Sequence, residues 1–180
     1  SSDLYDELFK DTYVYNNPTP NKNNYYILKF DFSGMNSATT LEETKTLFNN
    51  KVIRAIERFN NQYNITIDLD YTLSGPQLLA QFLTNVKIDK KIYILIDEYD
   101  TFTNSILSSD KTLFKNLLGK DGFIRDFYAI IKEARGSIVG RVFITGVCSI
   151  SLDSMTSGFN ISTNISVKPR FNAMTALTHD

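Results

Sequence analysis

A nearly unbroken apolar run, Lys91–Ile96, is the feature that most constrains how this chain can fold. The run has the length of one β-strand and lacks the strict alternation of a strand with one face in water. Such a strand is typical of a parallel sheet that is covered on both faces, and parallel sheets occur almost only in α/β proteins. Asp97-Glu98-Tyr99-Asp100 follows at once, so carboxylates stand at the carboxyl end of a strand that we expect to be buried.

The rest of the chain supplies the elements that such a fold needs. Aromatic and branched residues predict two further strands, and amphipathic patterns predict three helices. The predicted strands are 25–32 and 141–146, and the predicted helices are 41–63, 76–86 and 114–133, the last with a break before Phe123 at Gly119 and Gly122. Thr40 and Glu43 have the spacing of a capping box at the start of the first of these helices. The order strand, helix, helix, strand, helix, strand predicts an α/β fold with a parallel sheet flanked by helices.

Length and charge fit one domain of ordinary composition. The 180 residues are 42% hydrophobic and 22% charged, which is enough apolar material for a core. We expect a single domain over 1–180, with an N-terminal helix and loop over 1–24 and the α/β core over 25–180. Lys and Arg number 19 against 20 acidic residues, so the charge balance indicates neither nucleic acid nor an anionic membrane as a partner. No stretch has the length of a membrane-spanning helix, and we expect a cytoplasmic location.

Cysteine and histidine content excludes several kinds of site. Cys148 is the only cysteine of the chain, which rules out an intramolecular disulfide framework and a Cys-rich zinc site. His179, the only histidine, stands next to the end of the sequence. Catalytic triads and histidine-based zinc sites therefore lack their base or their ligands.

The acids after the central strand are the first candidates for chemistry. In open α/β sheets, ligands bind at the carboxyl ends of the strands. In a nucleotide hydrolase, Asp97 would hold the water shell of a magnesium ion, and Glu98 would orient or deprotonate the attacking water. The alternative is that Asp97 only caps the following helix and Glu98 is only solvated.

A hydroxyl group ends the last predicted strand in the same manner. If that strand is the neighbour of Lys91–Ile96, Thr145 comes level with Asp97 and could bond a γ-phosphate or the attacking water. The alternative is a threonine that finishes a strand and bonds a nearby backbone group.

Taken in order, these segments resemble the bacterial AAA-ATPase-like family. The resemblance is carried by Tyr26–Gly34, Tyr93–Asp100, Arg125–Lys132, Val142–Val147 and Ser157–Asn160. Members of that family typically join a P-loop ATPase domain to a C-terminal nuclease-like domain of the PD-(D/E)xK type. The resemblance implies an α/β domain of the P-loop NTPase kind, which uses ATP and Mg²⁺ in the intact protein.

The resemblance also assigns roles to single residues. Asp97 and Glu98 match the family's Walker B acids, and Thr145 matches the polar residue that ends the sensor strand. The implied roles are nucleotide and Mg²⁺ binding for Asp97, catalysis for Glu98, and both catalysis and nucleotide binding for Thr145. Asp100 completes the D-E-Y-D signature in a supporting position around the two acids.

One hallmark of P-loop proteins is missing from these residues. A phosphate loop requires G-x-x-x-x-G-K-[ST], and no such string occurs. Gly119-Lys120-Asp121 comes nearest but lacks both the first glycine and the hydroxyl after lysine. We therefore expect a partial domain without the first strand and the phosphate loop, inactive alone and without bound ATP. The sensor strand would then have an uncovered edge, which favours self-association.

Two other functions remain open at this point. The first is a non-catalytic interaction or regulatory module in which the acids belong only to the fold. The second is a phosphatase of the haloacid-dehalogenase kind, because Asp68, Asp70 and Thr72 match its D-x-D-x-T box. The chain order of the remaining groups that such a phosphatase needs is wrong here, so we expect both aspartates to lie in a loop.

Overall fold

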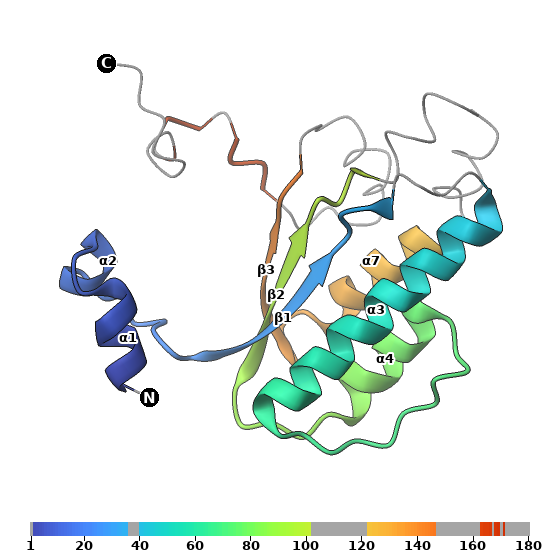
Figure 1. Ribbon diagram of the computed structural model, residues 1–180, viewed down its shortest axis with the longest axis horizontal. Coiled ribbons are helices and arrows are strands. Elements are labelled where there is room, and N and C mark those ends of the chain that lie inside the picture. Colours follow the sequence, from blue (N-terminus) through green and yellow to red (C-terminus); the bar gives the residue numbers. More distant parts are fainter. Residues whose placement is uncertain are drawn as a thin grey trace.

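A three-stranded parallel sheet forms the centre of the protein (Figure 1). Its strands are β1 (Tyr25–Asp31), β2 (Lys91–Asp97) and β3 (Val139–Ile144), and they lie side by side in that order. The expected α/β fold with a parallel sheet is thus confirmed, as is the neighbouring placement of β2 and β3. The computed structural model describes residues 2–35, 40–101, 122–146, 163–166, 168, 169 and 171.

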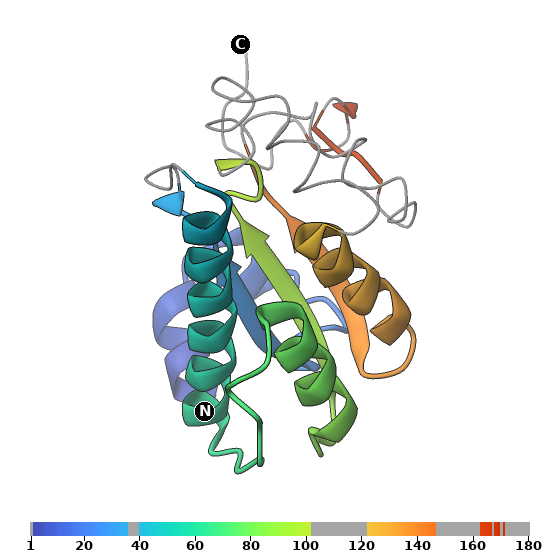
Figure 2. The same cartoon turned by 90° about the vertical axis from the view of Figure 1, so that its right-hand side faces the viewer.

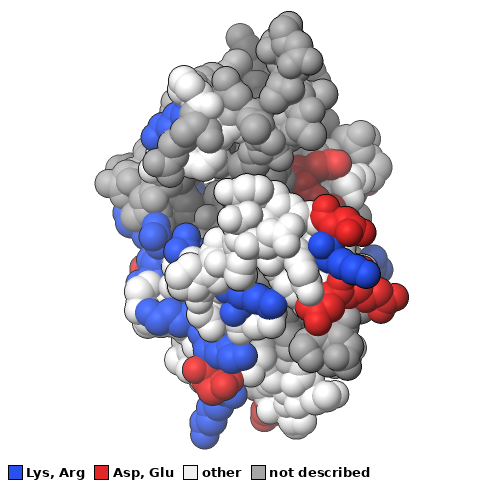
Figure 3. All heavy atoms as spheres, turned by 90° about the vertical axis from the view of Figure 1, so that its left-hand side faces the viewer, with Lys and Arg blue, Asp and Glu red and all other residues white. Residues whose placement is uncertain are grey.

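Three helices cover one face of this sheet. They are α3 (Leu41–Tyr63), α4 (Gly75–Asn85) and α7 (Phe123–Ala134), and Figure 2 shows them side by side in front of the strands. Two short helices, α1 (Ser2–Phe9) and α2 (Tyr13–Asn16), precede β1 and lie beyond the opposite face in Figure 1. Seen from that side, an uncharged area has Lys and Arg mainly on its left and below it, and Asp and Glu mainly on its right (Figure 3).

Local signals in the sequence set the ends of the longest helix. The Thr40 side chain accepts a hydrogen bond from the Glu43 amide, and the Glu43 carboxylate accepts one from the Thr40 amide. This is the predicted capping box, and α3 has the predicted bounds. The helix ends at Tyr63, and its C-cap Asn64 has a left-handed φ of 52°, a conformation that asparagine tolerates better than most residues.

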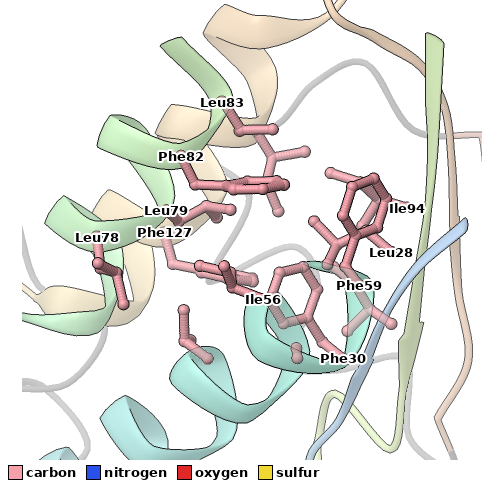
Figure 4. Packing of buried hydrophobic residues seen from close by; sticks show 14 of the residues in the cluster. Leu28, Phe30, Ile56, Phe59, Leu78, Leu79, Phe82, Leu83, Ile94 and Phe127 are labelled. Atoms are coloured by element: carbon pink, nitrogen blue, oxygen red, sulfur yellow. The ribbon is translucent and has the colours of Figure 1, made fainter. Parts of the chain in front are cut away.

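The core lies between the sheet and these helices (Figure 4). Alternate residues of β1 and β2 point into it, and aromatic and aliphatic residues of all three helices meet them. Its members include Leu28, Phe30, Ile92, Ile94, Ile96, Phe48, Ile56, Phe59, Leu78, Leu79, Phe82 and Phe127. Because one face of each strand packs into this core, the alternation of side chains also determines which residues lie on the other face of the sheet.

The opposite face of the sheet differs from our expectation. We expected β2 to be covered on both faces, but its residues alternate between buried and partly exposed. Ile92, Ile94 and Ile96 are buried, whereas Tyr93 and Leu95 are only partly buried. The prediction was wrong for the described part of the chain because α3, α4 and α7 all pack on the same face. We call this second face, formed by the alternate residues of the three strands, the open face.

The bounds of β1, β2 and α4 differ by one residue from those predicted, and the bounds of β3 differ by two. The last strand is Val139–Ile144 and not 141–146, so Thr145 stands immediately after it. In the helix predicted over 114–133 we expected a break before Phe123, and α7 does begin at Phe123 with Gly122 as its N-cap; residues 114–121 lie outside the described part. Cys148 and His179 lie outside it as well.

Candidate functional site

Polar side chains meet at the carboxyl edge of the sheet. Asp31 of β1 is the register partner of Asp97 at the end of β2. Thr145 follows Ile144, the register partner of Ile96, and its amide donates to the Ile96 carbonyl at 2.8 Å. The ladder thereby brings an acid, a second acid and a hydroxyl group to the same level of three adjacent strands.

The Asp97 carboxylate is bound from both sides. Its Oδ1 atom accepts a hydrogen bond of 2.7 Å from Thr145 Oγ1, and its Oδ2 atom lies 3.2 Å from Lys29 Nζ. These contacts stabilise the ionised form, so the Thr145 hydroxyl, followed by Lys29, lowers the pKa of Asp97. The side chain keeps 45% of its exposure, which leaves the carboxylate within reach of a ligand.

Lys29 and Asp31 extend the site beyond the residues that we predicted. They alternate on β1 with the buried Leu28 and Phe30, so they belong to the open face together with Asp97. Asp31 Oδ1 accepts a hydrogen bond from the Ser33 amide at 2.9 Å, and hydrogen bonding from Ser33 lowers the pKa of Asp31. The alternation of buried and polar residues along β1 was the signal in the sequence that Lys29 and Asp31 share one face of the strand. Only the register of β1 with β2 shows that Asp97 lies on the same face.

Glu98 turns the chain out of the sheet. Its φ of 52° is left-handed, an uncommon conformation for a residue with a long side chain. The side chain is exposed, and its Oε2 atom accepts a hydrogen bond of 3.0 Å from Thr101 Oγ1. The carboxylate is therefore accessible at the edge of the sheet, one residue beyond Asp97.

Asp100 lies below this turn in the interior. Its exposure is 1%, and the neighbouring Tyr99 is equally enclosed at 2%. Burial raises the pKa of the Tyr128 hydroxyl on α7, and the nearby Tyr99 and Asp100 raise it further. The two residues that follow the exposed acids are thus buried beside α7.

The D-x-D-x-T segment lies elsewhere. Asp68 and Asp70 stand in the connection between α3 and α4, as expected, and not at the end of a strand. Asp70 Oδ1 accepts hydrogen bonds from both the amide and the hydroxyl of Thr72, at 2.9 and 2.6 Å. These bonds give the segment a structural explanation as a turn. They lend no support to a phosphatase.

The donor atoms at the sheet edge suit a hard cation. Carboxylate and hydroxyl oxygens are the ligands that Mg²⁺ prefers, and Mg²⁺ commonly uses one or two carboxylates together with substrate phosphates and water. Asp97 and Thr145 supply such oxygens at one point. Within the described ranges, no group of three or more His, Cys, Asp or Glu residues is placed to hold a metal ion. The fit is therefore to an ion that is held largely by its ligand and by water.

Fold and site together are those of an α/β protein with polar groups at the carboxyl edge of a parallel sheet, an arrangement that is consistent with a partial P-loop-like domain. The chain belongs to the AAA-ATPase-like family of predicted AAA-ATPases, whose family model matches residues 1–156. This confirms the family that the sequence resembled. ATP and Mg²⁺ are the ligands that the family suggests.

Two further comparisons found nothing: neither the curated proteins nor the solved structures contain a match to this chain. None of the helices in the described ranges combines the length and the apolar character that crossing a membrane requires.

Proposed function

We propose that the carboxyl edge of this sheet is part of an ATP-hydrolysing site. The observation that supports this most directly is the 2.7 Å hydrogen bond between Thr145 and Asp97, the two residues that we assign to the sensor and Walker B positions. A hydroxyl group on one strand is thereby held against an acid on the next. A γ-phosphate bound at this point would accept a hydrogen bond from Thr145, and Asp97 would act on it through hydrated Mg²⁺.

Each residue has a distinct task in this proposal. Asp97 stays ionised and binds a water of the Mg²⁺ shell, since its contacts favour the charged form. Exposed Glu98 orients or deprotonates the attacking water. When nucleotide binds, Thr145 turns its one hydroxyl proton from Asp97 to the γ-phosphate or to that water. Asp100 is buried and supports the turn from below. When bound, Mg²⁺ would neutralise charge on the phosphates.

The phosphate loop would come from residues other than these 180, because they contain no G-x-x-x-x-G-K-[ST] string. We propose accordingly that residues 1–180 form one partial AAA-ATPase-like domain that is inactive alone and binds ATP weakly or not at all. A following nuclease-like domain and a cytoplasmic location belong to the same proposal. Backbone amides of the missing loop would supply most of the phosphate contacts.

The test uses the full natural chain and its Mg²⁺-dependent ATP turnover. Glu98→Gln should keep nucleotide binding and abolish turnover. Asp97→Asn should lower turnover and also raise the Mg²⁺ concentration that half-maximal turnover requires. Asp68→Asn is the matched control, because Asp68 lies in the α3–α4 connection, and it should leave turnover unchanged. Retained turnover in Glu98→Gln would exclude Glu98 as the residue that activates water. Loss of a phosphatase activity in Asp68→Asn would instead support the phosphatase.

A non-catalytic interaction module is the second candidate, and one observation favours it. In the described sheet β3 is an edge strand, and Val142, Phe143 and Ile144 are only partly buried. The other edge strand, β1, has one outward amide occupied, because Ile27 N–H donates to the Tyr63 hydroxyl at 2.9 Å. We therefore propose that the isolated chain self-associates through β3 and not through β1.

A further inference from the structure

The glycine after Thr145 packs against the turn that carries the acids. A Cβ atom on Gly146 would overlap the Tyr99 ring and would lie 2.5 Å from Asp100 Oδ1. Real Cβ atoms essentially never approach other heavy atoms that closely, and the neighbours here are enclosed in the core. The contact therefore exists only because residue 146 has no side chain.

Backbone hydrogen bonds hold the same two segments together. The Thr145 amide donates to the Ile96 carbonyl at 2.8 Å, and the Tyr99 amide donates to the Thr145 carbonyl at 3.2 Å. Thr145 thus bonds to the chain on both sides of Asp97 and Glu98. The turn between these anchor points contains the left-handed Glu98, so its geometry depends on where β3 ends.

The buried side of the turn extends to a helix. Tyr99 and Asp100 have 2% and 1% exposure, and both lie close enough to the enclosed Tyr128 of α7 to raise its pKa. Tyr99 is thus held between Gly146 at the end of β3 and the interior beside α7. A displacement of its ring would shift the backbone that leads directly into Glu98.

We propose that Tyr99 and Gly146 are positioning residues, which set the orientation of the Glu98 and Asp97 carboxylates through ring-to-backbone packing at the end of β3. The inference rests on the proposed ATP-hydrolysing function for its activity readout. It assigns no direct contact with the nucleotide to either residue. Disturbing the packing should therefore impair turnover more than nucleotide binding.

A matched control exists in the same strand. A Cβ atom on Gly140 would lie 2.7 Å from Tyr25 Cε1 and 3.1 Å from Lys91 Cβ, so this glycine also packs against a tyrosine ring. Tyr25 and Lys91 begin their strands, at the end of the sheet away from the acids. Gly140→Ala introduces a steric clash of the same kind, although a smaller one, without touching the turn.

The activity test compares these variants in the full natural chain. Gly146→Ala should lower kcat at least tenfold and change the Kd for ATP by less than about threefold, and Tyr99→Leu should show the same split. Gly140→Ala should reduce thermal stability without this loss of kcat.

The double variant Gly146→Ala with Tyr99→Leu should lose less kcat than the product of the two single effects, because the methyl group then meets no ring. Unchanged kcat in Gly146→Ala, or equal losses in Gly146→Ala and Gly140→Ala, would overturn the inference. Should Gly146→Ala fail to fold, Tyr99→Leu alone decides in the same way.

A second readout separates this inference from the proposed function. Amide hydrogen exchange at Tyr99 and Thr145 should accelerate at least tenfold in Gly146→Ala and remain unchanged in Gly140→Ala, with no nucleotide present. Unchanged protection in Gly146→Ala overturns the inference whatever the enzyme does. Suppose that the native chain shows no ATP turnover, or that Glu98→Gln retains it, while amide exchange responds as expected. The proposed function is then wrong, and the positioning role of Tyr99 and Gly146 remains supported.

Discussion

The hydroxyl of Thr145 donates a 2.7 Å hydrogen bond to Asp97 Oδ1, joining two residues that are 48 positions apart in the sequence. The bond crosses from the end of β3 to the end of β2. It is the main cause of the lowered pKa of Asp97, followed by the Lys29 ammonium group. The acid is thus kept ionised by its neighbours within the sheet, before any ligand arrives.

Removing this hydroxyl should raise the pKa of Asp97. In the native chain the pKa of Asp97 lies below the ordinary value of 3.8. The contacts of the carboxylate therefore stabilise the folded state above about pH 4, and this stabilisation is lost as the pH falls through the folded-state pKa. In Thr145→Val the carboxyl should titrate closer to 3.8. Carboxyl ¹³C shifts followed through a pH titration measure this directly.

Thr72→Val provides the control for that titration. Thr72 also donates to an aspartate, and its hydrogen bonds lower the pKa of Asp70. The variant should raise the pKa of Asp70 and leave Asp97 unchanged. An Asp97 titration that is the same in Thr145→Val and in the native chain would contradict the assigned role of the hydroxyl.

Replacing Lys29 with methionine should have only a small effect on stability. Its ammonium group lies 3.2 Å from Asp97 Oδ2, but the two side chains keep 53% and 45% of their exposure. Water and salt screen such a pair, so we expect Lys29→Met to change the free energy of unfolding by less than about 1 kcal/mol. Urea unfolding at low and high salt checks the value.

Lys45→Met is the comparison for Lys29→Met, because Lys45 forms an exposed ion pair with Glu42 on α3. Both variants should lose little stability. Only Lys29→Met should raise the pKa of Asp97, since Lys29 is the second cause of its lowering. A loss of several kcal/mol in Lys29→Met would show that the pair does more than orient Asp97.

Truncating Phe127 should destabilise the fold strongly. The ring is fully buried and contacts the rings of Phe30, Phe32 and Phe48, with centroids 5.0 to 5.9 Å away. Phe127→Ala removes these contacts and leaves a cavity, for which about 3–5 kcal/mol of lost stability is expected. Tyr13→Ala should change stability by less than about 0.5 kcal/mol, since Tyr13 is 82% exposed. Denaturant unfolding of both variants makes the measurement, and similar losses would contradict the core assignment.

A charge on β3 should reduce self-association of the isolated chain. Phe143 is partly buried on the open face of this edge strand, and lysine is a residue that natural edge strands use against pairing. Light scattering should show a smaller mean mass for Phe143→Lys than for the native chain. Tyr71→Lys, at an exposed residue of the α3–α4 connection, should leave the mass unchanged. A native chain that is monomeric at high concentration would contradict this prediction.

Local signals are sufficient to predict part of this fold. The bounds of α3 follow from its capping box and its apolar period, because both act within a few residues. The end of β2 is marked by Asp97, where apolar residues stop. The start of β3 is not predictable in this way, because Gly140, a poor strand residue, stands second in the strand, where it packs against Tyr25.

Long-range relations are predictable only where both partners end a strand. Asp97 and Thr145 can be paired from the sequence, since neighbouring parallel strands end at one edge. Lys29 cannot, because its contact with Asp97 depends on the register of β1 with β2. The exposure of the open face could not be predicted for a similar reason, because the identities of Tyr93 and Leu95 do not indicate on which face of the sheet the helices pack.

The left-handed backbone at Glu98 has a consequence for protein engineering. Glycine adopts this torsion freely, and the relief of about 1 kcal/mol roughly offsets the extra chain entropy that glycine loses on folding. Directed evolution for heat resistance alone would therefore accept Glu98→Gly without penalty. Such a library would yield robust molecules that have silently discarded the carboxylate on which hydrolysis is proposed to depend.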